Sequence, residues 1–324
     1  MLNVLLGVIL LFSNISHANS SKSLPPVNRG IVVGLLEIDE KTHLREVDLS
    51  KHIYKVFNDW GIKTVLIDYG KIITHKKIQE ELFSPAKQGQ DEVSAGNHLV
   101  LDEVKVKVEE FIEEQKINRI LISGNYCNLC SKFFSHTSCS QVVTEAIMRI
   151  VDNNPAIHLL GICGSLRNIV NTKGVEVVNV DSLAVKEGKV SRSKSVPNLQ
   201  QKNIPLKQIK IIPNSRLAKV VAKFLPPDEN GWFSIYLPDT DSGEVSNTSE
   251  NRRKLELLGY KVAAFSSNGV IEAIEDKYSN IFFRSHPEAL IVESGKSFYL
   301  LNHKAYQVST LVAMAIINDF LYRA

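Results

Sequence analysis

The sequence predicts an α/β fold, in which a doubly wound and mostly parallel sheet carries a β-rich C-terminal portion and a closing helix. Two observations support this prediction. Short apolar runs alternate with amphipathic stretches through the first half of the chain, as strands and helices do in parallel sheets. The 324 residues are 44% hydrophobic and 23% charged, which is typical of a globular chain with a large core.

The first elements form a strand-helix-strand unit. GIVVGLLEI (30–38) is an apolar strand, residues 48–61 form an amphipathic helix that ends at Gly61, and residues 62–70 form a second strand. The polar stretch from Ser84 to Asn97 contains Pro, Gly and Gln, which predicts a surface loop.

Two further helix-strand pairs complete the first half. Residues 101–117 form a charged helix that leads to the apolar strand 119–124, and residues 140–154 form a helix that leads to AIHLLGIC. The carboxyl ends of parallel strands lie at one edge of a sheet, where ligands bind. We therefore expect the chemistry in the glycine-bearing turns that follow these two strands.

The second half is less regular. Residues 186–210 contain seven Lys or Arg and one Glu, which predicts a solvated loop, with a basic recognition loop as the alternative. A short helix follows over 214–225, with Asn214 or Ser215 as its cap. The C-terminal part consists of three strand candidates and a final amphipathic helix, in the stretches YKVAAFSS, GVIEAIED, NIFFRSHPEAL and AYQVSTLVAMAIINDFLYRA.

Residues 1–18 have the pattern of a secretory signal peptide. The apolar run Val4–Phe12 is too short to span a bilayer, and a small-x-small pattern that ends at Ala18 follows it. We expect cleavage after Ala18 and an exported protein, periplasmic or secreted. An uncleaved interfacial anchor is the alternative, because no Lys or Arg precedes the run. No other segment is long and apolar enough for a transmembrane helix.

The charge of the chain predicts its class of partner. A formal net charge of +3 is too small to indicate nucleic acid binding. A small molecule or a peptide is therefore the expected ligand.

GICGS (161–165) contains the candidate nucleophile. Cys163 is either a nucleophile on a strand-to-helix turn or a small buried hydrophobic residue. A cysteine nucleophile needs a base and a carboxylate that orients it. In SHPE, His286 and Glu288 are two residues apart after an apolar strand, so their side chains point to the same side. A surface turn at Pro287 is the alternative.

Five segments, in this order, resemble the class I glutamine amidotransferase superfamily, and within it the γ-glutamyl-γ-aminobutyrate hydrolase-like branch, peptidase family C26. They are LISGN, LLGICGSLRNIVNTKG, IIPNSRLAKV, NGVIEAIE and SHPEA. The resemblance implies a flavodoxin-like sheet in a single domain over residues 30–324. It also implies hydrolysis of a γ-glutamyl amide bond in a small compound or peptide through a cysteine thioester, without a cofactor or a metal.

The resemblance assigns a role to each site residue. Cys163 is the nucleophile, His286 the general base and then acid, and Glu288 the residue that orients the histidine. The backbone N–H groups of Gly124 and Gly164 form the oxyanion hole. The sequence departs from the family in FFRS before the histidine, in Cys-Gly-Ser at the nucleophile and in the missing substrate segment. A catalytically inactive binding or scaffolding relative is therefore the alternative.

CNLCSKFFSHTSC places Cys127, Cys130, His136 and Cys139 within 13 residues. Three uses of these residues remain open: a disulfide, which is common in exported chains, unconnected thiols, or a zinc site. If Cys163 is the nucleophile, three cysteines remain, so one of them stays outside any pair.

Overall fold

The computed structural model describes residues 30–38, 44–73, 95–124, 139–179, 206–239, 243–291 and 304–323. The chain from Ile31 to Ala324 forms one compact unit. The predicted signal peptide, residues 1–18, lies outside the described residues.

Nine strands of the described residues form one sheet in the order β2-β1-β3-β4-β11-β10-β9-β6-β7. The strands from β2 to β11 are parallel to their neighbours, and the pairings from β11 to β7 are antiparallel. The chain winds outward in both directions from β1, which confirms the doubly wound α/β class and its β-rich C-terminal portion. The antiparallel pairing of that portion was not predicted. The strands are β1 Val32–Leu36, β2 Lys63–Ile67, β3 Arg119–Ile122, β4 His158–Ile162, β6 Leu206–Ile211, β7 Phe233–Pro238, β9 Lys261–Ser266, β10 Ile271–Glu275 and β11 Ile281–Phe283.

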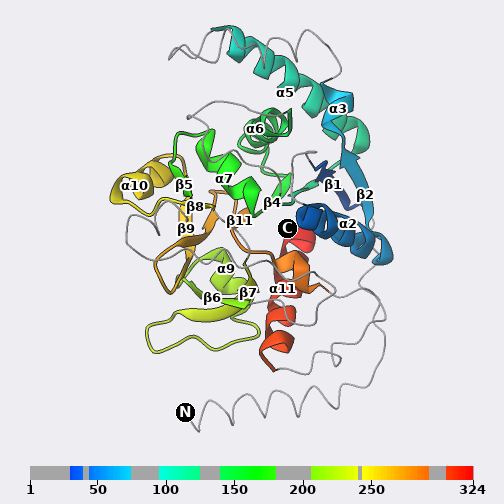
Figure 1. Ribbon diagram of the computed structural model, residues 1–324. Coiled ribbons are helices and arrows are strands. Elements are labelled where there is room, and N and C mark those ends of the chain that lie inside the picture. The colour runs from blue at the N-terminus through cyan, green and yellow to red at the C-terminus, as the bar shows by residue number, and fades with distance from the viewer. Residues whose placement is uncertain are drawn as a thin grey trace. The chain divides into compact units, whose positions relative to one another are not determined.

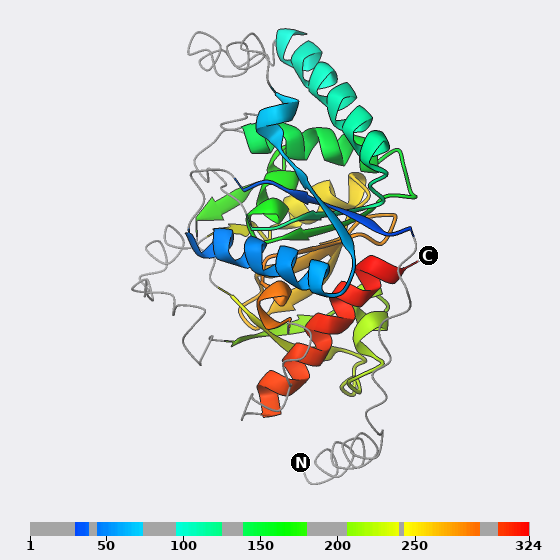
Figure 2. The same ribbon diagram turned by 90° about the vertical axis from the view of Figure 1, so that its right-hand side faces the viewer.

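Helices cover both faces of the sheet (Figures 1 and 2). One face packs against α5, α6 and α7, and the other packs against α2, α9 and α11. Adjacent residues of a strand point to opposite faces of the sheet. Ile120 packs with the α5, α6 and α7 side chains, and Leu121 packs with those of α2, α9 and α11. The helices are α2 Leu44–Asp59, α3 Tyr69–Ile72, α5 Ala95–Gln115, α6 Cys139–Val151, α7 Gly164–Asn171, α9 Arg216–Val221, α10 Ser249–Leu257 and α11 Lys304–Tyr322, with the 3₁₀ helix η2 at Pro287–Leu290.

Several element boundaries differ from the sequence prediction. Helix α5 begins at Ala95, six residues before its predicted start, so the prediction of a surface loop over 84–97 is wrong for its last three residues. Helix α9 covers only Arg216–Val221 of the predicted 214–225. Helix α2 begins at Leu44, four residues before its predicted start, because its first turn lacks the apolar period.

Strand β6 begins at Leu206, inside the segment predicted as a solvated loop, so the loop prediction is wrong for its last residues. The many lysines led to the loop prediction, but at the end of β6 buried and exposed residues alternate, with Ile209 and Ile211 buried.

The C-terminal half also contains elements that were not predicted. Strand β7 forms the far edge of the sheet, and β5 (Val177–Asn179) pairs with β8 (Gly243–Val245) in a separate two-stranded sheet. The predicted cap of α9 is Ser215, whose Oγ accepts a hydrogen bond from Ala218 N at 2.9 Å. Within the described ranges, no helix is both long and apolar enough to cross a membrane.

Candidate active site

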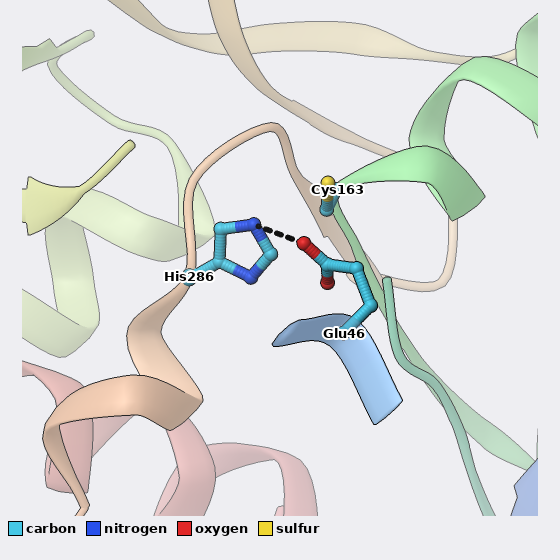
Figure 3. Close-up of side chains that lie close together, drawn as sticks. All are labelled: Glu46, Cys163 and His286. Carbon is cyan, nitrogen blue, oxygen red and sulfur yellow. Dashed lines mark ion pairs between the residues drawn. The ribbon is translucent and has the colours of Figure 1, made fainter. Parts of the chain in front are cut away.

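Four neighbouring parallel strands bring the candidate residues to one edge of the sheet. Strands β1, β3, β4 and β11 are adjacent, so their carboxyl ends share that edge. The chain beyond these four ends carries Glu46, Gly124, Cys163 and His286, in that order. Figure 3 shows the carboxylate of Glu46 pointing toward Cys163 and His286.

Cys163 lies on a strained turn between β4 and α7. Its φ of 56° and ψ of −115° are unfavourable for a residue with a Cβ and cost about 1–3 kcal/mol. Two backbone hydrogen bonds hold the turn, from Cys163 N to Phe283 O at 2.7 Å and from Leu166 N to Cys163 O at 3.1 Å. The residue is the N-cap of α7, where the helix dipole favours a thiolate.

The small residues of GICGS make this turn possible. A Cβ at Gly161 would lie 2.7 Å from Phe282 Cδ1 and 3.0 Å from Ser165 Oγ, so the position has no room for a side chain. Ser165 is fully buried, and its Oγ donates a hydrogen bond to Ile162 O at 2.8 Å. The buried hydroxyl of Ser165 therefore stabilises the turn from its inner side.

His286 and Glu288 form a buried pair at the end of β11. His286 Nδ1 lies 2.8 Å from Glu288 Oε1, and both side chains are fully buried. An ionised carboxylate only accepts hydrogen bonds, so the N–H at Nδ1 of His286 donates to Glu288. The other ring nitrogen, Nε2, is directed toward Cys163 and Glu46. The backbone N–H of His286 donates to Pro238 O at 2.9 Å, which fixes the start of this segment.

Arg284, in the segment FFRS, is a buried cation two residues before His286. Arg284 Nη1 lies 2.8 Å from Asp239 Oδ2 and 3.2 Å from Glu272 Oε1. Lys207 Nζ contacts the same two carboxylates at 3.0 and 2.6 Å. Burial raises the pKa of Glu272, and the two cations act against that rise. This ion-pair network fixes the chain just after β11, and so restricts the position of His286 two residues later.

Glu46 is the residue that the sequence analysis missed. It lies in the first turn of α2, and its Oε1 is 3.4 Å from His286 Nε2. A Cβ at Gly124 would overlap Glu46 Oε2, and would lie 2.7 Å from Glu46 Cδ and 3.3 Å from Cys163 Cβ. The carboxylate therefore lies between the loop after β3 and the nucleophile turn. One indication was available, an acidic residue in the first turn of the helix that follows β1.

The charges around His286 control its protonation. Burial of the ring by itself lowers the pKa of His286, but the negative charges of Cys163, Glu288 and Glu46 outweigh burial and raise this pKa well above the usual 6.5. The imidazole therefore carries a proton at neutral pH. An imidazolium beside a cysteine stabilises the thiolate form of that cysteine.

The structure brings all five predicted site residues together. Cys163 and His286 face each other with Glu288 behind the histidine, and Gly124 lies against Cys163. Gly164 is the first residue of α7, so its N–H is among those that have no acceptor within the helix.

The other cysteine cluster is only partly described. Cys127, Cys130 and His136 lie outside the described residues, and Cys139 is the first residue of α6. No disulfide joins Cys139 to Cys163, the two cysteines of the described ranges.

No protein-family model and no curated protein sequence matches the chain. Two solved structures are among those similar to the chain. The glutaminase domain of Trypanosoma brucei CTPS with bound acivicin is 15% identical with a TM-score of 0.46, over 88% of this chain and 93% of that chain. A glutamine amido transferase from Methylobacillus flagellatus is 9% identical with a TM-score of 0.46, over 91% of this chain and 96% of that chain. These values are too low to assign a family.

Proposed function

We propose that the chain is a hydrolase that cleaves a γ-glutamyl amide bond through a cysteine thioester, as a divergent enzyme of the class I glutamine amidotransferase type. Its sequence resemblance to the γ-glutamyl-γ-aminobutyrate hydrolase-like branch suggests this substrate class. The observation that carries the proposal is the placement of Cys163 on a strained turn at a helix N-terminus, beside the buried His286–Glu288 pair.

In the acylation half, the Cys163 thiolate attacks the amide carbonyl carbon. A C–S bond forms and the carbonyl electron pair moves onto the oxygen, where the N–H groups of Gly124 and Gly164 stabilise it. When this intermediate collapses, the C–N bond breaks and His286 gives its Nε2 proton to the leaving amine. Glu288 holds the imidazole orientation throughout, at 2.8 Å from Nδ1.

In the deacylation half, His286 is neutral and accepts a proton from water. The resulting hydroxide equivalent attacks the thioester carbon, the C–S bond breaks, and Cys163 leaves as a thiolate. The acid product departs with a γ-carboxylate, and the thiolate–imidazolium pair is restored.

Glu46 supports the choice of a γ-glutamyl substrate. Its side-chain carboxyl is chemically the same group as the γ-carboxylate that this hydrolysis leaves. That carboxyl lies against Gly124 and Cys163, where the product carboxylate would be released. Glu46 has to rotate aside before a substrate binds, while α2 stays fixed through Phe57 in the core and through His52 Nε2, which is 3.0 Å from Ile291 O.

Product release tests the proposal directly. The full chain is incubated with a panel of γ-glutamyl amides, and the release of amine and of glutamate is followed. We expect release that is lost in Cys163→Ala and reduced in His286→Ala. Selective labelling of Cys163 by iodoacetamide at neutral pH, weaker in His286→Ala, is the second readout. Labelling no faster than that of an unstructured thiol, without product release, would reject the proposal.

A non-catalytic binding protein is the second candidate, and the position of Glu46 favours it. A carboxylate between Gly124 and Cys163 places a negative charge where a developing oxyanion would need donors. Glu46→Ala separates the two functions. The hydrolase proposal predicts turnover that persists or increases in this variant, whereas the binding protein predicts no turnover in either protein and a phenotype that survives Cys163→Ala.

We also propose export, on the signal-peptide pattern of residues 1–18. Mass analysis of the chain recovered from outside the cytoplasm tests this proposal. A mature form that begins at Asn19 is expected, and recovery only of uncleaved chain would contradict it.

A further inference from the structure

The geometry points to a binding site for one zinc ion at Glu46, Cys163 and His286. The three side chains come from three separate parts of the fold, and one ligand atom of each lies within 4.8 Å of the other two (Figure 3). This inference goes beyond the proposed hydrolase and does not depend on it, because metal binding is measured without any substrate. The sequence predicted no metal at this centre.

The donor set matches zinc chemically. A thiolate, an imidazole nitrogen and a carboxylate oxygen are the three ligand types that zinc takes in proteins. A thiolate disfavours magnesium and calcium, which prefer oxygen ligands. Three protein ligands leave the fourth tetrahedral position for water or another small ligand.

The one resolved ligand-to-ligand distance agrees with a shared metal ion. Two ligand atoms about 2.0–2.1 Å from zinc, at a tetrahedral angle of about 109°, lie about 3.4 Å apart. Glu46 Oε1 and His286 Nε2 are 3.4 Å apart, which is longer than an ordinary N–H···O hydrogen bond. The other two pairs need about 3.6 Å, so side chains now within 4.8 Å have to close only slightly.

The surroundings of the histidine match a metal ligand. Histidines that bind zinc donate their other ring N–H to a carboxylate, which fixes the tautomer and strengthens the ligand. Glu288 Oε1 takes this role at 2.8 Å from His286 Nδ1. His286 is fully buried, and Nε2 has no hydrogen bond of good geometry within the described part of the chain. The nitrogen that would bind the metal is therefore directed into the cluster.

Charge also favours a dication here. Because zinc binds a thiolate and an unprotonated ring nitrogen, its binding displaces protons held by these two ligands. The negative groups at the cluster are the Cys163 thiolate and the carboxylates of Glu46 and Glu288, and together they more than offset the two positive charges of the ion. Because the ion takes the thiolate and Nε2, bound zinc blocks alkylation of Cys163.

The first test is metal protection of Cys163 in the chelator-treated full chain. Iodoacetamide labelling of the peptide that contains Cys163 is measured by mass spectrometry, with and without zinc. Reading that peptide alone excludes the cysteines of CNLCSKFFSHTSC. We expect zinc at micromolar concentration to slow labelling at least about tenfold, and magnesium at millimolar concentration to have no effect. Equal labelling with and without zinc would overturn the proposal.

Ligand variants form the second test, with zinc affinity measured against a chromophoric chelator. Glu46→Gln should weaken binding at this site by at least about tenfold, and Glu288→Gln by about 10–100-fold through the orientation of His286. Asp48→Asn is the matched control, because Asp48 is an exposed carboxylate on the same helix. The zinc affinity of this variant should equal that of the wild type. Unchanged protection of Cys163 by zinc in Glu46→Gln would remove Glu46 from the site.

Cobalt gives a readout that is independent of activity. Cobalt in place of zinc should produce a thiolate-to-metal absorption band that disappears in Cys163→Ser. A band that persists in Cys163→Ser and vanishes when Cys127 and Cys130 are replaced would assign the metal to the other cluster and overturn the proposal. Absence of γ-glutamyl hydrolysis leaves all three metal readouts intact, so the two proposals fail separately.

Discussion

Gly124→Ala should destabilise the chain through one clash, which is with Glu46. The added Cβ would overlap Glu46 Oε2 and would lie 2.7 Å from its Cδ, while the next atom, Cys163 Cβ, is 3.3 Å away. The φ of Gly124 lies outside the left-handed region, so the methyl group adds no backbone strain. The cost therefore comes from displacing the Glu46 carboxylate.

The magnitude follows from these contacts. Overpacking at a closed position costs about 1–3 kcal/mol, and rotation of Glu46 out of the site places this cost near the lower end, about 1–2 kcal/mol. In a Glu46→Ala background only the 3.3 Å contact with Cys163 Cβ remains, and a small shift relieves it. There we expect Gly124→Ala to cost less than about 0.5 kcal/mol, so the coupling energy between the two positions is about 1 kcal/mol or more.

Urea unfolding of the wild type, the two single variants and the double variant measures this coupling. Gly34→Ala with Glu46→Ala is the control cycle, because a Cβ at Gly34 would clash with Ile67 and Ile117 and not with Glu46. The control pair should be additive within about 0.5 kcal/mol. Additivity of Gly124→Ala and Glu46→Ala would show that the carboxylate does not lie against Gly124, and would refute the placement of Glu46 on which the zinc site depends.

Three further predictions concern single positions. Cys163→Gly should be more stable than Cys163→Ala by about 1 kcal/mol in urea unfolding, because glycine accepts the φ of 56°, whereas an unstrained position would give the opposite order. Glu46→Ala should speed alkylation of Cys163, because the side chain that lies between Gly124 and the nucleophile turn is removed, and a slower rate would contradict this. Burial and two neighbouring arginines lower the pKa of His158 from 6.5 to about 4. The unfolded chain then binds the extra proton, so stability is constant above about pH 6.5 and falls by about 3 kcal/mol as the pH drops toward 4. His158→Gln should remove this slope, and an unchanged slope would exclude His158 as its cause.

The periodicity of apolar residues in the sequence predicted most of the fold. The apolar runs at β1, β3 and β4 lie in the parallel part of the sheet, and the close spacing of β9, β10 and β11 predicted the β-rich portion. The start of β6 was assigned to a loop because the sequence shows its lysines but not the carboxylates that pair with them. Lys207 pairs with Glu272, which lies 65 positions further along the chain, and such a pair follows only from the pairing of strands.

The candidate site was predicted as far as its residues follow strand ends. Cys163 and His286 each come directly after an apolar run, so their convergence follows from the shared edge of a parallel sheet. Glu46 could not be predicted in the same way, because α2 has its apolar period only from Leu49 onward and the turn before it has the composition of a solvated surface. Its direction depends on how α2 packs against the sheet, and no local pattern records that packing.

The position of β11 in the sheet has a consequence for the order in which the protein is synthesised. This strand lies between β4 and β10, yet among the described residues it is the last strand in the sequence and leaves the ribosome after the other eight of the sheet. Phe283 in β11 accepts the hydrogen bond that holds the Cys163 turn, and His286 and Glu288 follow directly after it. A nascent chain therefore exposes an ordinary thiol at Cys163, and the reactive centre forms only after translation has passed Glu288.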